Sequence, residues 1–158
     1  MNDQAIAILN QNRTMAISTL RPDGWPQTTI VGYANDGFVL YFLIFRASQK
    51  FANISGDDRV SLAIGQEPRD LRQAQAVYAA AFAAEVVNSH ERERAWRLLV
   101  DRHPNLSGTA IPDSSQTALM RAECRHVSVL DYTKGLGHAD ALNLGVEDWA
   151  PAATKGER

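Results

Sequence analysis

The residues whose types and spacing suggest chemistry are Arg46, Ser48 and Lys50, directly after an apolar run over residues 38–45. The spacing of apolar residues changes beyond this point, which predicts a strand that enters a short helix. Free N–H groups and the helix dipole favour an anion at a helix start, and the two cations can add charge-assisted hydrogen bonds. The junction could therefore hold a phosphate. In the alternative interpretation, the two cations are solvated and Ser48 only caps the helix.

Composition limits the function classes that are open to this chain. Its 158 residues suit one domain, which we expect over residues 1–145, with a disordered tail over 146–158. The net charge of -2 at pH 7 argues against a general nucleic-acid or membrane-surface binder. The N-terminus lacks a signal-peptide pattern and the apolar stretches are too short to span a bilayer, which predicts a cytoplasmic protein.

Other chemistry has little support in the sequence. Cys124 is the single cysteine, which excludes an intrachain disulfide and a cysteine-rich metal site. Its valine neighbours suggest a strand, so we expect a packed or surface thiol and not a nucleophile. No histidine pair has metal-ligand spacing on one helix face, and no Gly-x-Ser-x-Gly, dinucleotide or Walker pattern is present. We therefore predict no metal and name no catalytic acid or base.

The elements that must position the junction are mostly strands. Turn residues at 21–24 and 35–37 separate the first three predicted strands, which indicates a three-stranded antiparallel meander. Residues 72–87 are ambiguous, because their alanines favour a helix while their valines and Phe82 favour a strand. We predict a strand there, since the meander needs a partner on which to close. The six predicted strands cover residues 15–20, 27–34, 38–45, 59–66, 72–87 and 119–132.

Three helices and an irregular segment complete the expected fold. The helices cover residues 3–12, 48–55 and 89–103, and Ser89 is the expected N-cap of the last. Residues 133–144 are rich in glycine and are expected to be irregular. Six mostly antiparallel strands with appended helices predict a mainly β fold, a small β-barrel.

The order of these segments resembles the pyridoxamine 5′-phosphate oxidase-like family, the FMN-binding split barrels. The similarity covers most of residues 13–140 and rests on five segments in one order, residues 15–33, 38–54, 57–62, 75–103 and 131–140. The resemblance implies a six-stranded antiparallel split β-barrel that forms a homodimer. It also implies FMN in two equivalent grooves between the subunits, where a small-molecule substrate would bind.

The resemblance assigns cofactor contacts to three segments near the N-terminal half of the barrel. Arg46, Ser48 and Lys50 would hold the FMN phosphate, with Gln49 beside them. Leu43 and Ile44 would face the same groove, and Gln66 would contact the flavin ring. The second strand would line the ring and its ribityl chain through Thr28, Thr29, Ile30 and Val31.

The C-terminal tail offers Lys134 and His138 as further cofactor contacts. His138 could stack over the flavin, or donate to substrate or haem from the partner subunit. It could equally be a surface histidine. The arginines that hold the substrate phosphate in true pyridoxamine phosphate oxidases have no clear counterpart here, so the resemblance does not imply vitamin B6 synthesis.

The sequence therefore predicts an FMN-dependent oxidoreductase in which the flavin carries the electron chemistry. The alternative is a non-enzymatic protein that binds a flavin, a deazaflavin (F420) or haem on the same barrel. A third possibility is an empty barrel that acts only as a dimeric partner module. Redox turnover with a nicotinamide donor separates the first two, because their folds are identical.

Overall fold

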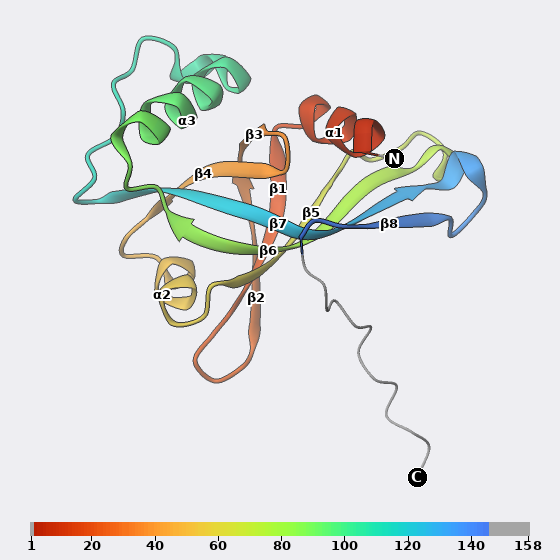
Figure 1. The fold of residues 1–158 in the computed structure, drawn as a ribbon, viewed down its shortest axis with the longest axis horizontal. Coiled ribbons are helices and arrows are strands. Elements are labelled where there is room, and N and C mark those ends of the chain that lie inside the picture. The colour runs from red at the N-terminus through yellow and green to blue at the C-terminus, as the bar shows by residue number, and fades with distance from the viewer. Residues whose placement is uncertain (1, 146–158) are drawn as a thin grey trace.

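Eight strands form one curled antiparallel sheet in the computed structural model, which describes residues 2–145 (Figure 1). The order across the sheet is β2-β1-β5-β6-β7-β4-β3, and β8 pairs with β7 beside this path. The predicted mainly β split-barrel class is confirmed. The strands are β1 (Thr14–Leu20), β2 (Pro26–Gly32), β3 (Ala34–Asp36), β4 (Val39–Phe45), β5 (Arg59–Gly65), β6 (Gln75–Glu85), β7 (Thr117–Asp131) and β8 (Ala139–Asn143).

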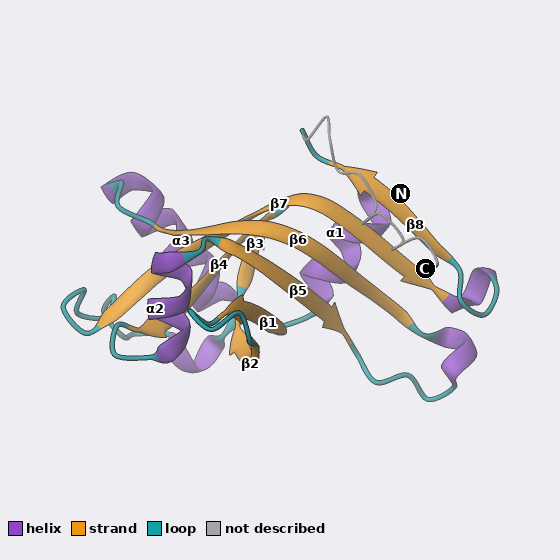
Figure 2. Ribbon diagram, turned by 90° about the horizontal axis from the view of Figure 1, so that it is seen from below, coloured by secondary structure: helices purple, strands orange, loops and turns teal. Residues whose placement is uncertain are grey.

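Three α-helices flank the sheet, namely α1 (Asn2–Gln11), α2 (Gln49–Gly56) and α3 (Ser89–Arg102). Figures 1 and 2 place α2 near the end of β4 and the β7–β8 hairpin at the opposite end of the molecule. The prediction that Ser89 caps α3 is wrong by one residue. Asn88 is the N-cap, because its extended backbone lets its side chain accept a hydrogen bond from the Glu91 N–H.

The predicted meander of the first three strands is wrong in one pairing. β1 pairs with β2 and β3 pairs with β4, but the other edge of β4 pairs with β7. β2 and β3 lie at opposite ends of the sheet order although Tyr33 alone separates them in the chain. The turn at Tyr33 therefore brings the two ends of the sheet together and curls it into a barrel.

Tyr33 is fully buried and is held by groups from two helices and the residues that follow them. Its hydroxyl donates to the Leu9 carbonyl at 2.6 Å, and its own carbonyl lies 2.9 Å from Nε2 of His103. The Arg102 guanidinium lies over the ring and donates to the Leu9 and Asn12 carbonyls. Burial raises the pKa of Tyr33 to about 12. The joint between the two ends of the sheet is thus fixed by both α1 and α3.

The alanine-rich segment is a strand, as predicted. β6 pairs with β5 and with β7, so both of its edges form ladders. Ala79, Ala81 and Ala83 point into the core, where a curled sheet leaves little room for larger side chains. Ladders on both edges and the small inward side chains outweigh the helix preference of alanine.

The segment over residues 133–144, which was expected to be irregular, contains a strand. A short turn over Tyr132–Lys134 is followed by β8, which pairs with the second half of β7. Together with the short β3, this strand explains why the sheet has eight strands and not six. The predicted disordered tail, 146–158, lies outside the described residues.

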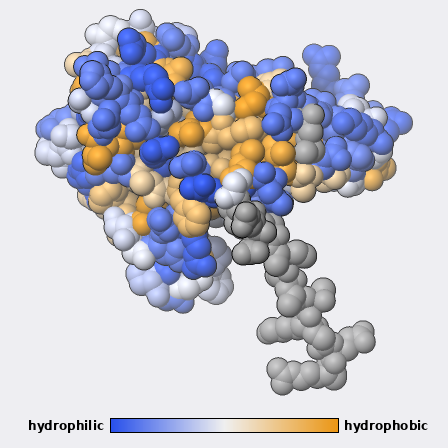
Figure 3. All heavy atoms as spheres, viewed as in Figure 1, coloured by the Kyte–Doolittle hydropathy of each residue, from blue (hydrophilic) through white to orange (hydrophobic). Residues whose placement is uncertain are grey.

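The core fills the space between the curled sheet and α1, and a second apolar cluster lies under α3. Cys124 belongs to the core, and burial raises the pKa of its thiol to about 12. The prediction of a packed thiol is confirmed, and both its burial and its raised pKa disfavour the thiolate form. In Figure 3, apolar side chains gather over the middle of the molecule, between the hydrophilic surfaces of α3 and of the β7–β8 hairpin.

Asn53 fixes α2 against the first hairpin. Its side chain is buried and donates to Thr19 Oγ1 and to Gln27 Oε1, each at 3.0 Å, while its Oδ1 accepts from Gln49 Nε2 at 2.8 Å. We expect Asn53→Ala to lower the free energy of unfolding by about 2 kcal/mol, because buried Thr19 loses its partner. Ser55→Ala, which removes an exposed hydroxyl from the same helix, serves as the control. Equal urea midpoints for the two variants would contradict this role of Asn53.

Asp131 links α1 to the end of β7 and makes stability depend on pH. Hydrogen bonds from Thr133, and then from Gln4, lower the pKa of this buried carboxyl from 3.8 to about 2. Because the folded pKa lies below the unfolded one, its contribution is complete above pH 3.8 and is lost as the pH falls towards 2.

We therefore expect Asp131→Asn to flatten the decrease of unfolding free energy between about pH 4 and pH 2. Urea unfolding measured at several pH values checks this expectation. Asp101→Asn, which alters an exposed carboxyl of α3, is the matched control. A slope that stays the same in Asp131→Asn would overturn the assignment.

Candidate cofactor site

The corner between β4 and α2 is built as an N-capped helix start. Ser48 has extended backbone, and its Oγ accepts from the Phe51 N–H at 3.3 Å and donates to the Phe45 carbonyl at 2.6 Å. The predicted strand, cap and helix are confirmed here. Within residues 2–145, the backbone N–H groups of Gln49 and Lys50 have no hydrogen-bond partner. These two donors are therefore available to an anion.

Arg46, which follows the last residue of β4, is already engaged within the protein. Its two terminal nitrogens form a forked ion pair with Glu85 at the end of β6, and its Nε donates to the Ser114 carbonyl at 2.5 Å. The guanidinium also lies 5.4 Å from the centre of the Phe51 ring. Hydrogen bonding to Glu85 raises the pKa of Arg46. The predicted phosphate residue thus has a carboxylate partner before any ligand arrives.

Lys50 differs from Arg46 in this respect. It is half-buried in the first turn of α2 and forms no ion pair with any side chain that the structure describes. Its ammonium can therefore meet an anion without first leaving a partner. Glu85, which sequence reasoning missed, makes the two cations unequal.

Gln49 and Asn53 connect this corner to β2. The hydrogen bonds of Asn53 hold Gln27, and Thr29 lies on the same side of β2, two residues further along. Thr29 Oγ1 is buried and has no hydrogen-bond partner among the described residues. A buried hydroxyl without a partner costs free energy, so this position is suited to a ligand group.

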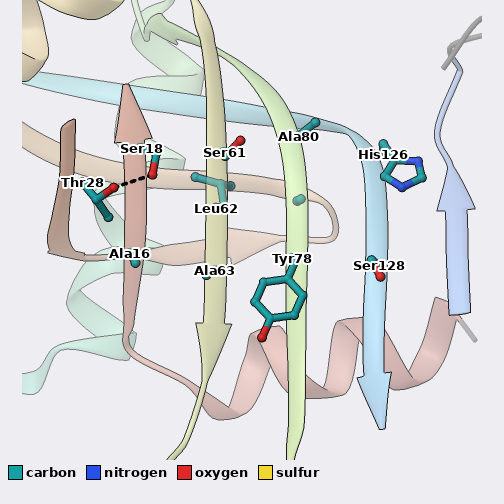
Figure 4. A pocket seen from close by; sticks show the side chains of 11 residues that line it. Ala16, Ser18, Thr28, Ser61, Leu62, Ala63, Tyr78, Ala80, His126 and Ser128 are labelled. Carbon is teal, nitrogen blue, oxygen red and sulfur yellow. Dashed lines mark hydrogen bonds between the residues drawn. The ribbon is translucent and has the colours of Figure 1, made fainter. Parts of the chain in front are cut away.

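Two of the other predicted positions on β2, Thr28 and Ile30, lie on the opposite side of the strand from Thr29. Thr28 Oγ1 bonds to Ser18 Oγ at 2.7 Å, at the edge of a hollow of about 360 Å³ on the outer side of the sheet (Figure 4). Ile30 and Gln66 line a neighbouring hollow of about 390 Å³. Val31 lies on the same side of β2 as Thr29 and packs against the core. The four β2 positions cannot share one groove within a chain, because successive side chains of a strand alternate between its faces.

The expectation that Leu43 and Ile44 face one groove is wrong for the same reason. Ile44 is buried in the main core. Leu43 points the other way and lines a hollow of about 240 Å³ with Gly32, Leu99 and His103. This hollow lies between β4 and the end of α3.

Lys134 and His138 do not join the corner within one chain. Both lie at the tip of the β7–β8 hairpin, which Figures 1 and 2 place far from α2. They converge on Asp140, with His138 Nε2 at 3.0 Å and Lys134 Nζ at 3.7 Å from its Oδ2. The hydrogen bond from His138 and the charge of Lys134 lower the pKa of Asp140.

The outer face of the sheet carries two rows of mostly small side chains, of which sequence reasoning had assigned only Thr28 and Ile30 to a site. Strand pairing places the rows side by side, as Ile30-Ala16-Ala63-Tyr78-Ser128-Ala141 and Thr28-Ser18-Ser61-Ala80-His126-Asn143. In the first row, the side chains of Tyr78 and Ile30 remain 46% and 70% exposed. His126 Nδ1 lies 2.5 Å from Asn143 Oδ1. We call this surface the outer sheet face (Figure 4).

Residues 2–145 give no support to two further possibilities, a metal centre and a membrane-spanning helix. No group of three or more His, Cys, Asp or Glu side chains there could hold a metal ion. In the same part of the chain, no helix combines the length and apolar character needed to cross a bilayer.

Comparison with known proteins identifies the family. The sequence matches the family described as pyridoxamine 5′-phosphate oxidase over residues 1–131. The chain belongs to this family. No curated protein matches the sequence.

Solved structures with low sequence identity share the fold. A haem-binding protein from Mycobacterium smegmatis has a TM-score of 0.77 at 19% identity, over 90% of this chain and 57% of the other. This chain thus spans little more than half of that protein. A putative pyridoxamine 5′-phosphate oxidase from Listeria innocua has a TM-score of 0.68 at 17% identity, over 82% and 97%. An FAD-binding protein from Mesorhizobium loti has a TM-score of 0.63 at 19% identity, over 79% and 90%.

Proposed function

We propose that this chain binds FMN at the β4–α2 corner and acts as an oxidoreductase on a small molecule in the cytoplasm. The observation that carries the proposal is the set of unused polar groups beside the corner. The Lys50 ammonium and the N–H groups of Gln49 and Lys50 can bind a phosphate, and the buried Thr29 hydroxyl can bond to a polar atom of the flavin. Family membership supports a flavin as the ligand.

A bound flavin supplies the transfer of electrons or of a hydride. The residues of this chain bind and orient it. Lys50 and the start of α2 hold the phosphate, and the hydrogen bonds of Asn53 keep β2 and α2 at a fixed separation. Arg46 retains two of its five N–H donors for the ligand while it is bound to Glu85 and Ser114.

The proposed protein is a homodimer in which a second copy covers the outer sheet face. That face offers small side chains which allow close approach, with Tyr78, Phe82 and Ile30 as large exposed groups. Aromatic side chains of this kind are common anchors of interfaces. In the dimer, the hairpin tip with Lys134 and His138 would contact the flavin or substrate of the partner subunit.

The second candidate is a protein that binds haem, FAD or a deazaflavin without turnover. The structural similarity to haem-binding and FAD-binding proteins favours it, and His138 is the residue that could meet a haem. Turnover of a bound flavin with NADH or NADPH would favour the oxidoreductase. A haem absorbance band from the purified protein would favour the second candidate.

Removing both cations of the corner tests the site. We expect Arg46→Ala with Lys50→Ala to weaken FMN binding by roughly a hundredfold, since each charge-assisted hydrogen bond contributes about 1.5–3 kcal/mol. Riboflavin, which has no phosphate, should bind equally to the unaltered protein and to the double variant. Titration followed by flavin absorbance or fluorescence measures the affinities.

Two further variants make this test specific. The pair Arg59→Ala and Arg72→Ala has the same charge change at exposed arginines that bond to nearby aspartates, and it should bind FMN normally. Lys50→Ala alone disturbs no ion pair of the described chain, so loss of binding there cannot come from an unpaired Glu85. Unchanged FMN affinity in these corner variants would refute the site. Failure of the unaltered protein to bind FMN would refute the function.

Tyr78→Glu tests the homodimer. A buried carboxylate opposite its own copy should weaken association by at least about a hundredfold, so the variant should sediment as a monomer at concentrations where the unaltered protein is dimeric. Leu71→Glu, at an exposed leucine outside the outer sheet face, is the control. Sedimentation of the unaltered protein as a monomer would contradict the proposed dimer.

A further inference from the structure

The two cations of the β4–α2 corner are chemically unequal, and Glu85 is the cause. Arg46 gives three of its N–H donors to Glu85 and to the Ser114 carbonyl, whereas Lys50 has no carboxylate partner among residues 2–145. The corner therefore carries two cations and one carboxylate, with a net charge of one positive unit.

Glu85 occupies a fixed position. It is the last residue of β6 and pairs with Met120 of β7. The next residue, Val86, extends this pairing, because its N–H donates to the Leu119 carbonyl of β7 at 2.8 Å. About 30% of each side chain of the Arg46–Glu85 pair is exposed, so water screens the carboxylate only in part. A ligand phosphate at this corner therefore meets the field of Glu85 as well as that of the cations.

We infer that Glu85 tunes how the corner responds to the charge of a phosphate, because it weakens the binding of doubly charged phosphomonoesters more than the binding of singly charged phosphodiesters. This inference rests on the proposed flavin site. A phosphomonoester such as that of FMN carries close to two negative charges above its second pKa of about 6. Each phosphate of a dinucleotide pyrophosphate, as in FAD, carries one. Glu85 therefore repels the monoester more strongly than a singly charged diester, so its charge lowers the affinity for FMN more than the affinity for FAD.

Glu85→Gln tests the inference, because the amide removes the charge, keeps one oxygen acceptor for Arg46 and gives up only the second bond of the fork. At pH 8 we expect this variant to bind FMN about tenfold more tightly, while its FAD affinity changes by less than about threefold. Glu123→Gln is the matched control. It also removes a carboxylate paired with arginines, and it lies on β7 opposite Val39, at the other end of β4 from the corner.

The flavin titrations separate this inference from the proposed function. If the unaltered protein binds a flavin and Glu85→Gln changes the affinities for FMN and FAD equally, or changes neither, the role of Glu85 is wrong and the flavin site stands. If the unaltered protein binds neither flavin, the proposed function is wrong.

A second measurement decides the role of Glu85 without any flavin. Phenyl phosphate and dimethyl phosphate serve as doubly and singly charged probes, and the backbone amide signals of Gln49 and Lys50 report binding in NMR titrations. We expect Glu85→Gln to tighten phenyl phosphate binding about tenfold and dimethyl phosphate binding much less. Equal changes for the two probes, or no response of these amides in either protein, would overturn the inference.

Discussion

The structure depends on the joint at Tyr33, where the two ends of the sheet are connected by a single residue. Because β2 and β3 lie at opposite ends of the sheet order, their connection requires the sheet to curl. The buried ring, its hydrogen bond to Leu9 and the Arg102 guanidinium hold this curvature in place from α1 and α3. The curl in turn places the end of β4 near the first hairpin, so that α2 can bond to it through Asn53. The corner is therefore a product of barrel closure.

The electrostatics of the corner are local. The whole chain has a net charge of -2, so long-range attraction cannot concentrate an anionic cofactor. What remains are the Lys50 ammonium, two backbone N–H groups and the part of Arg46 that Glu85 does not use. An anion site with few cations depends strongly on each neighbouring charge. A carboxylate bonded directly to one of the two cations is consequently more important than acidic residues elsewhere on the surface.

The family places this chain on a barrel that serves different ligands, and the fold does not choose between them. The distinguishing features are side chains at three places. These are the charges at the β4–α2 corner, the buried Thr29 hydroxyl on β2, and the Lys134, His138 and Asp140 cluster at the hairpin tip. The hairpin tip is distant from the corner within one chain, so any joint action of the two requires a second copy. The outer sheet face, with its small side chains around Tyr78, is the surface that such a copy would cover.

The sequence by itself determined the local features of this protein. Alternation of apolar residues located the strands around the corner, glycine marked the turns at Gly24 and Gly37, and Ser48 marked the start of α2, because each of these signals depends on residues that are neighbours in the chain. Even β6 could be predicted against its alanine content, from its valines and from the need for a strand partner. Only the tertiary structure decided that β4 pairs with β7, that β8 extends the sheet, and that Glu85 holds Arg46 across 39 residues of sequence. Those contacts join segments that are remote in the chain, and they exist only after the sheet has curled. The same closure buried the Thr29 hydroxyl without a hydrogen-bond partner among residues 2–145 and turned Ile44 into the core, which no local pattern of residue types could specify.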